Sequence, residues 1–267
     1  MKRVRRLSFP ARPILTAFAV VLLALPTSFV VVASFTKGIE IVFPPHGLTF
    51  HWYLAVVRNA ATWHALLNSV HVALVAVVIG IAVGLPAALA LPSFRPRRRL
   101  LLLLLLSLGL STPVIVSAFS FFSLFSKIGV LSHLTVVGLA LGIVNLPFML
   151  WPIISALEDQ DPELPAAAAT LGADPVEQFL FIRLPLMASG IVTGAVFMFV
   201  VSITDFVVSE VLTTVNDQTL PVFIYSGLRA NISPSLGAAS AFFIILATLV
   251  FILVLRIGGV ERFLIRR

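Results

Sequence analysis

Apolar residues occur along this chain in runs of about 20, and short polar segments separate the runs. A helical run of about that length matches the thickness of a bilayer's hydrocarbon core. Prolines inside the runs do not exclude helices, because neighbouring helices or water can satisfy the freed backbone groups. The pattern predicts an all-α polytopic membrane protein with six transmembrane helices, at 14–35, 65–91, 100–125, 134–156, 186–211 and 236–257.

Composition supports a lipid environment. The 267 residues are 60% hydrophobic and 11% charged, and their mean hydropathy is +1.11, whereas a soluble domain is about a quarter charged. The chain has no cysteine, which excludes disulfides, thiolate metal sites and cysteine nucleophiles. Its net charge of +7 gathers at the ends of apolar runs, a topology signal that argues against nucleic-acid binding.

The distribution of basic residues predicts the orientation. With six spans, both termini share one side, and that side holds all but four of the 18 Lys and Arg residues; the exceptions are Lys37, Arg58, Lys127 and Arg229. The positive-inside rule then places both termini in the cytoplasm. The expected organisation is an N-terminal tail (1–13), a transmembrane domain (14–257) that includes a cytoplasmic loop (157–185), and a C-terminal tail (258–267).

The cytoplasmic loop carries six of the chain's eleven acids and contains signals for two short helices. Asp161 is expected to cap a helix that begins at Pro162. The alanines at 166–169 favour helix, and Gly172 is expected to end it in the left-handed conformation.

A second set of capping signals follows at once. Asp174 as N-cap, Pro175 at the first position and Glu177 at the third form a capping box. This helix is expected to run to about Arg183, and Pro185 then opens the fifth span. The expected apolar face of the two helices consists of Leu164, Leu171, Phe179, Leu180 and Ile182. Helices that lie on membranes usually carry Lys or Arg on their polar face, so this acidic loop favours a partner outside the membrane.

The loop resembles the EAA loop of ABC importer permeases through Ala167-Ala168-x-x-Leu171-Gly172, nine intervening residues, and Ile182-x-Leu184-Pro185. The resemblance implies that a cytoplasmic ATPase subunit holds the loop's short helix in a groove and moves it. The coupling residues assigned on this basis are Ala166, Ala167, Ala168, Leu171, Gly172, Ala173, Phe179, Ile182, Leu184 and Pro185. Ala166 departs from the family, which usually has glutamate there. The departure bears on an ionic contact with the ATPase and not on the docking itself, and Glu163 is an alternative source of that contact.

Further segments resemble the second permease subunit of spermidine/putrescine-type importers. They are Asn68-Ser69, Ser202-Ile-Thr-Asp205-Phe206, Thr219-Leu220-Pro221-Val-Phe-Ile-Tyr225 and Ile232-Ser233-Pro234. The resemblance implies the type I ABC importer permease fold and a small polar solute, with a polyamine as the best guess. It leaves phosphonate, opine, thiamine and ferric iron open as other solutes.

The resemblance also implies the partners. They are two copies of an ATPase subunit, a second homologous permease subunit and an extracytoplasmic solute-binding protein, assembled among the lipids of a bacterial inner (plasma) membrane. The chain lacks the phosphate-binding pattern G-x-x-x-x-G-K-[ST]. ATP and Mg are therefore expected in the partner ATPase, and this chain is expected to be a transport subunit without catalytic residues, metal or bound cofactor.

Asp205 and Glu210 are the only acids within an apolar run, and acids at membrane depth are costly and usually functional. On one continuous helix, their five-residue separation would turn them about 140° apart. We expect Asp205 to line the substrate pathway, Glu210 to lie at its outer mouth, and Tyr225 to join them. The alternative role for Asp205 is as a structural partner of a helix end or of another subunit.

Two other classes of function fit less well. An intramembrane enzyme needs a nucleophile with a base, or a metal cluster, and the sequence has neither H-E-x-x-H nor G-x-S-x-G. A stand-alone proton-coupled transporter would favour paired acids within the spans and repeated halves. Neither class accounts for the long, doubly capped loop.

Overall fold

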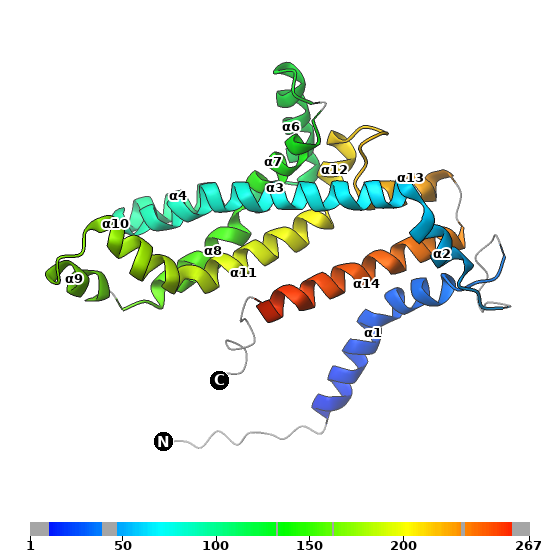
Figure 1. Cartoon of the computed structure of the whole chain (residues 1–267), viewed down its shortest axis with the longest axis horizontal. Coiled ribbons are helices and arrows are strands. Elements are labelled where there is room, and N and C mark those ends of the chain that lie inside the picture. The colour runs from blue at the N-terminus through cyan, green and yellow to red at the C-terminus, as the bar shows by residue number, and fades with distance from the viewer. Residues whose placement is uncertain (1–10, 39–46, 132, 162, 231–232, 258–267) are drawn as a thin grey trace. The chain divides into compact units, whose positions relative to one another are not determined.

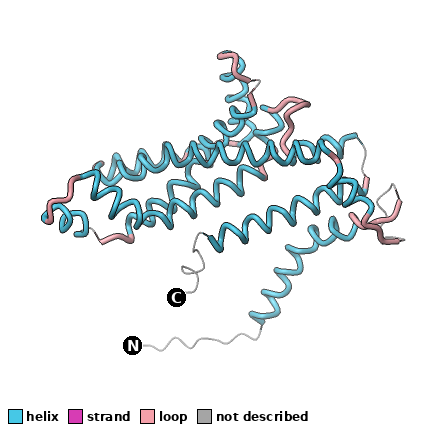
Figure 2. The backbone as a smooth tube through the Cα atoms, viewed as in Figure 1, coloured by secondary structure: helices cyan, strands magenta, loops and turns pink. Residues whose placement is uncertain are grey.

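The computed structural model describes residues 11–38, 47–131, 133–161, 163–230 and 233–257 (Figure 1). These residues are almost entirely helical, as Figure 2 shows, and their one β-bridge pairs Thr36 with Leu48. The predicted all-α class is therefore confirmed. The predicted tails lie outside the described residues, except that 11–13 belong to helix α1 (Ala11–Ala33).

The described chain divides into two compact units, and the first combines residues up to 59 with 226–245. It contains α1, α2 (His51–Arg58), the end of α13 (Leu220–Ala230) and the start of α14 (Pro234–Ile257). Side chains hold α2 to the segment that follows α1: the hydroxyls of Ser34 and Tyr53 lie 2.6 Å apart, and the Trp52 indole donates to the Thr36 carbonyl at 3.1 Å.

The second unit contains a bundle of four helices around α3 (Ala60–Ala90). Helices α7 (Leu134–Val144), α8 (Leu146–Glu158) and α11 (Leu184–Ile203) all pack on α3, and α8 also packs along α11 (Figure 1). Beside them, α6 (Val114–Lys127) packs against α12 (Val207–Leu212). The centre of the bundle is apolar, and its fully buried side chains include Met149, Leu150, Ile153, Met187 and Met198.

Glycines set the close approach of these helices. A Cβ atom on Gly138 in α7 would lie 2.6 Å from the Val75 Cβ and 2.8 Å from the Val72 carbonyl oxygen of α3. We therefore expect Gly138→Val to destabilise the bundle by about 1–3 kcal/mol, the usual cost of overpacking. Thermal unfolding of the purified protein in detergent measures the loss.

The matched control for this substitution is Ala82→Val, because Ala82 is exposed on α3. Placing valine there adds apolar volume without a buried neighbour to displace. Equal unfolding temperatures for the two variants would show that the α3–α7 contact tolerates a side chain and is not close-packed in solution.

All six predicted spans coincide with helices. Among the described residues, three helical stretches are long and apolar enough to cross a membrane, namely Pro13–Ala33, Ala60–Ser93 and Pro175–Ile203, and α7 with α8 would make a fourth as a bent pair. The second stretch includes the 3-10 turn η1 (Leu91–Ser93). Shorter apolar helices lie in the third and sixth predicted spans.

The predicted third, fourth and fifth spans are not continuous helices. The third divides into α4 (Pro96–Leu106), α5 (Leu108–Ser111) and α6, and the fourth bends by 48° between α7 and α8. The fifth stops at Ile203 and resumes at Val207. Proline explains the break before α6 and the bend before α8, because Pro113 precedes α6, Pro147 follows the bend, and neither can donate a helical hydrogen bond.

Candidate functional site

The first half of the loop that is predicted to be cytoplasmic forms α9 (Glu163–Thr170), as its capping signals predict. The Asp161 carboxylate accepts a hydrogen bond from the Glu163 amide at 2.9 Å, and Gly172 has φ +91°. The Ala173 amide donates back to the Ala168 carbonyl at 3.1 Å, which closes the turn after the helix. The predicted cap at Asp161 and the left-handed stop at Gly172 are confirmed.

The predicted capping box of the next helix, α10 (Pro175–Gln178), is also confirmed. The Asp174 carboxylate accepts from the amides of Val176 and Glu177, both at 2.8 Å. In return, the Asp174 amide donates to the Glu177 carboxylate at 3.0 Å. Because these bonds satisfy the first free amides of the helix, the chain's direction after Gly172 is set locally.

The end of the loop differs from the prediction. A π-helical turn, η2 (Phe179–Arg183), joins α10 directly to α11, so one helical stretch runs from Pro175 to Ile203. As expected, Pro185 lies in the first turn of the helix that forms the fifth span, α11 (Leu184–Ile203), but no break separates that helix from the loop. The Leu184 amide reaches the Phe179 carbonyl, and such a widened turn accommodates a proline ring at the start of the following helix. The loop's second helix is thereby continuous with α11.

The surface of this loop exposes large apolar side chains. Leu171 is 88% exposed, Phe181 76% and Val176 63%, and Leu164 and Leu180 are exposed to a smaller extent. Sequence reasoning named Leu164, Leu171 and Leu180 but missed Val176 and Phe181. Large apolar side chains that face water are unfavourable, so these exposed positions suit a surface that a partner covers.

The other residues predicted to couple to an ATPase occupy different positions. Ala167 and Pro185 are exposed, while Ala173, Phe179, Ile182 and Leu184 are half-buried. Ala168 is buried and helps to hold the two short helices together. The side chain of Ala166 lies outside what the structure describes, so its predicted role stays a prediction.

An ion pair ties the start of the loop to the segment that precedes the third predicted span. The Arg99 guanidinium of α4 lies 2.6 Å from the Glu158 carboxylate at the end of α8. Both side chains are partly exposed, so the pair orients the loop more than it stabilises the fold.

The candidate pathway residue Asp205 caps a helix. One of its carboxylate oxygens, Oδ1, accepts from the Val208 amide at 3.1 Å and from the Ser209 amide at 3.0 Å, and the Ser209 hydroxyl lies 3.3 Å away. The alternative role, a structural partner of a helix end, is therefore confirmed. Within the described residues the second oxygen, Oδ2, has no partner, so the predicted contact with substrate stays open.

The structure brings Tyr225 close to this cap. Its ring packs on that of Phe206, with centroids 4.6 Å apart. Glu210 is half-buried on α12, and its amide donates to the Phe206 carbonyl at 2.7 Å. Because the helix is interrupted at 204–206, the predicted 140° between Asp205 and Glu210 does not apply.

Two motifs that are far apart in the sequence meet in this region. The Asn68 amide group donates to the Gln218 carbonyl at 3.0 Å, and the Ser69 hydroxyl accepts from the Leu220 amide at 2.8 Å. These bonds hold the start of α13 against α3. A buried bond of 3.3 Å also joins Asn145, at the bend before α8, to Ser202.

Comparison with known proteins identifies the class of this chain. Residues 76–259 match the family described as binding-protein-dependent transport system inner membrane component. The chain therefore belongs to this family, and it is a multi-pass permease subunit of a bacterial inner-membrane ABC importer.

Individual relatives agree with this class. The chain is 29% identical over 207 residues to the spermidine/putrescine transport system permease protein PotC of Haemophilus influenzae, covering 78% of this chain and 80% of PotC. It is 30% identical over 204 residues to the putative ABC transporter permease protein ORF1 of Streptomyces antibioticus, covering 74% and 88%. A bacterial ABC transporter involved in import of the acidic polysaccharide alginate has a chain of the same fold, with TM-score 0.72, 14% identity and 93% of both chains covered.

Proposed function

We propose that this chain is the permease subunit of an ATP-driven importer of a small organic cation, with a polyamine such as spermidine or putrescine as the best candidate. The exposed apolar side chains of the loop, held by two capped helices that continue into α11, carry the proposal. The substrate class is supported by the likeness to the permease named for spermidine and putrescine.

In this proposal a separate ATPase subunit, present in two copies, binds ATP and Mg and grips the loop through Leu171, Val176 and Phe181. ATP-driven closure of the ATPase pair displaces the loop, and the continuous helix of α10, η2 and α11 passes the displacement into the bundle. A second, homologous permease subunit completes the pathway, and an extracytoplasmic binding protein delivers the solute.

Cysteine crosslinking tests the docking surface, because the chain has no cysteine of its own. With Leu171→Cys as the single thiol, a bifunctional maleimide in membrane vesicles is expected to link this chain to the co-expressed ATPase. The control is Val215→Cys, at an equally exposed position (86%) outside the loop. Absence of an ATPase adduct from Leu171→Cys, or equal yields from both positions, would contradict docking at the loop.

Uptake by the reconstituted importer tests the substrate. Labelled putrescine or spermidine is expected to enter proteoliposomes only with internal ATP and the binding protein present. Competition by unlabelled polyamines, but not by phosphonates, opines, thiamine or ferric iron, would support a polyamine. Uptake of one of those other solutes without polyamine uptake would replace the polyamine as the proposed substrate.

A further inference from the structure

A groove follows the contact between α8 and α11, and two rows of side chains line it. On α8 and its C-cap the row is Trp151, Ser155 and Asp159, and on α11 it is Ser189, Thr193 and Phe197. Members of each row are four residues apart, so each row lies on one helical face. The groove comprises two adjoining hollows, of about 210 and 440 Å³, which share Pro152, Ser155 and Thr193.

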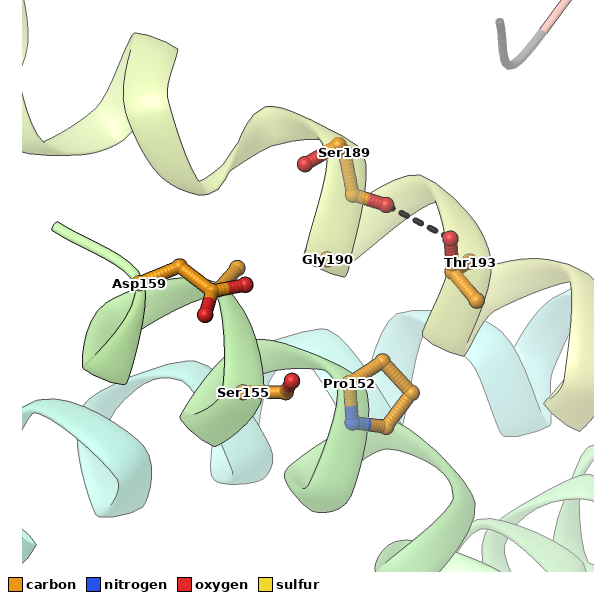
Figure 3. A pocket seen from close by; sticks show the side chains of 7 residues that line it. Pro152, Ser155, Asp159, Ser189, Gly190 and Thr193 are labelled. Atoms are coloured by element: carbon orange, nitrogen blue, oxygen red, sulfur yellow. Dashed lines mark hydrogen bonds between the residues drawn. The ribbon is translucent and has the colours of Figure 1, made fainter. Parts of the chain in front are cut away.

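The chemistry of the groove changes along its length. Phe148, Trp151 and Phe197 line the larger hollow, which is apolar and aromatic. The smaller hollow is lined by Asp159, the hydroxyl-bearing Ser155, Ser189 and Thr193, and Gly190 (Figure 3). The groove thus leads from aromatic rings, past hydroxyl groups, to a single carboxylate. We call it the α8–α11 groove.

Close helix packing forms the floor of this groove. A Cβ atom on Gly190 would lie 2.5 Å from the Pro152 carbonyl oxygen and 2.7 Å from the Ala156 Cβ. Glycine is therefore required at 190, because any side chain would push α11 away from α8. The groove is a fixed feature of the packed bundle rather than a gap between loosely arranged helices.

The polar groups at the acidic end are available to a ligand. Within the described residues, no hydrogen bond or ion pair engages the side chains of Ser155, Ser189 or Asp159. The Thr193 hydroxyl donates to the Ser189 carbonyl at 2.7 Å, a bond drawn in Figure 3, so its oxygen is left as an acceptor. Each of these side chains can therefore accept a hydrogen bond from a ligand.

We infer that the α8–α11 groove binds a linear organic cation on its way through the permease, with an ammonium group on Asp159 and the rest of the molecule along the hydroxyls toward Trp151 and Phe197. The inference rests on the proposed function. Carboxylates and aromatic faces both attract ammonium groups, and the methylene chain of a diamine suits the apolar walls. A lipid chain or a partner's apolar helix would leave Asp159 and the hydroxyls without a partner.

Transport kinetics of the complete importer in proteoliposomes test this inference, with putrescine and spermidine as probes. Loss of an exposed ion pair or cation–π contact is expected to raise KM about two- to fivefold in Asp159→Asn and in Trp151→Leu. Asp159→Glu is expected to retain a KM near that of the wild type, and Asp159→Lys to raise KM further. Asp217→Asn removes the same charge from an exposed loop outside the groove and is expected to leave KM unchanged.

Fluorescence measures binding without transport. The chain has three tryptophans, so Trp52→Phe with Trp63→Phe leaves Trp151 as the only one in this subunit. Putrescine added to the assembled permease–ATPase complex is expected to alter the Trp151 emission, and Asp159→Asn to shift the response to higher concentration. The same measurement on Trp151→Leu in this background gives the emission of the partner subunits, which is then subtracted.

The outcomes separate the two proposals. Polyamine import by the wild type with unchanged KM in Asp159→Asn and Trp151→Leu would overturn the groove assignment and leave the proposed function intact. A Trp151→Leu variant that fails to assemble with its partner permease, while Asp159→Asn keeps a wild-type KM, would mark the groove as a packing surface and also overturn it. If the wild type imports no polyamine, the proposed substrate fails and the groove assignment fails with it. Polyamine import with unaltered Trp151 emission would reject the groove alone.

Discussion

Replacing Gly172 with valine is expected to abolish uptake while the protein still reaches the membrane. Gly172 has φ +91°, and a β-branched residue held in that region costs about 1–3 kcal/mol. No atom lies within 4 Å of the position that a Cβ would occupy there, so the effect is conformational and not steric. This penalty shifts the conformational equilibrium of the turn between α9 and α10 by about five- to 150-fold. The docking surface is then displaced. Uptake assays measure transport, and immunoblots of membrane fractions measure how much of the protein reaches the membrane.

A second glycine provides the matched control for this substitution. Gly129, in the turn after α6, has φ +75° and likewise has open space at its Cβ position. Gly129→Val therefore introduces similar strain outside the loop, and we expect transport to continue. Gly172→Asn is expected to retain uptake, because asparagine tolerates the left-handed region. Wild-type uptake in Gly172→Val at normal membrane levels would count against coupling through this turn.

Local signals in the sequence are sufficient to predict most of the coupling loop. Asp161, Gly172, Asp174 and Glu177 act on neighbours within three residues, so their roles do not depend on the rest of the fold. The continuity of the helix from Pro175 to Ile203 is not predicted, because a proline at position 185 usually marks a helix start. A π turn accommodates this proline. Whether that turn forms depends on the preceding five residues and their packing, and the sequence has no simple signal for it.

Hydropathy locates the apolar segments but not the breaks within them. The bend at Asn145 and the break after Ile203 are linked by the bond between Asn145 and Ser202, residues 57 apart in the sequence. Such a bond depends on which helices lie side by side, and apolar periodicity does not specify that arrangement. Geometry based on an unbroken fifth helix, including the angle between Asp205 and Glu210, is therefore wrong.

The α8–α11 groove depends on helix register in the same way. Each row of side chains has helical spacing in the sequence, but the alignment of Asp159 with Ser189, and of Trp151 with Phe197, follows from the contact of Gly190 with Pro152. In the sequence of either helix alone, the serines, aromatic residues and acid are scattered. Helix packing is then the simpler interpretation of these residues. Only the structure shows that the two rows of side chains lie side by side, and the inferred binding of a cation depends on that arrangement.

Replacing Asp205 with asparagine is expected to lower uptake of a cationic solute about tenfold, the usual effect of losing a hydrogen bond to a charged group. Asparagine is as good a helix cap as aspartate, so it can keep the bonds to Val208 and Ser209 while removing the charge. Stability in detergent should therefore change little. Initial rates of putrescine uptake, compared with unfolding temperature, separate the two contributions.

Asp205→Ala completes this comparison, because alanine removes both the cap and the charge. Its loss of the bonds to Val208 and Ser209 is expected to cost about 0.5–2 kcal/mol of stability. If Asp205 acts only as a cap, Asp205→Asn transports like the wild type and only Asp205→Ala is impaired. If Oδ2 contacts the solute, both variants lose transport but only alanine loses stability, because the solute contact and the cap use different oxygens of one carboxylate.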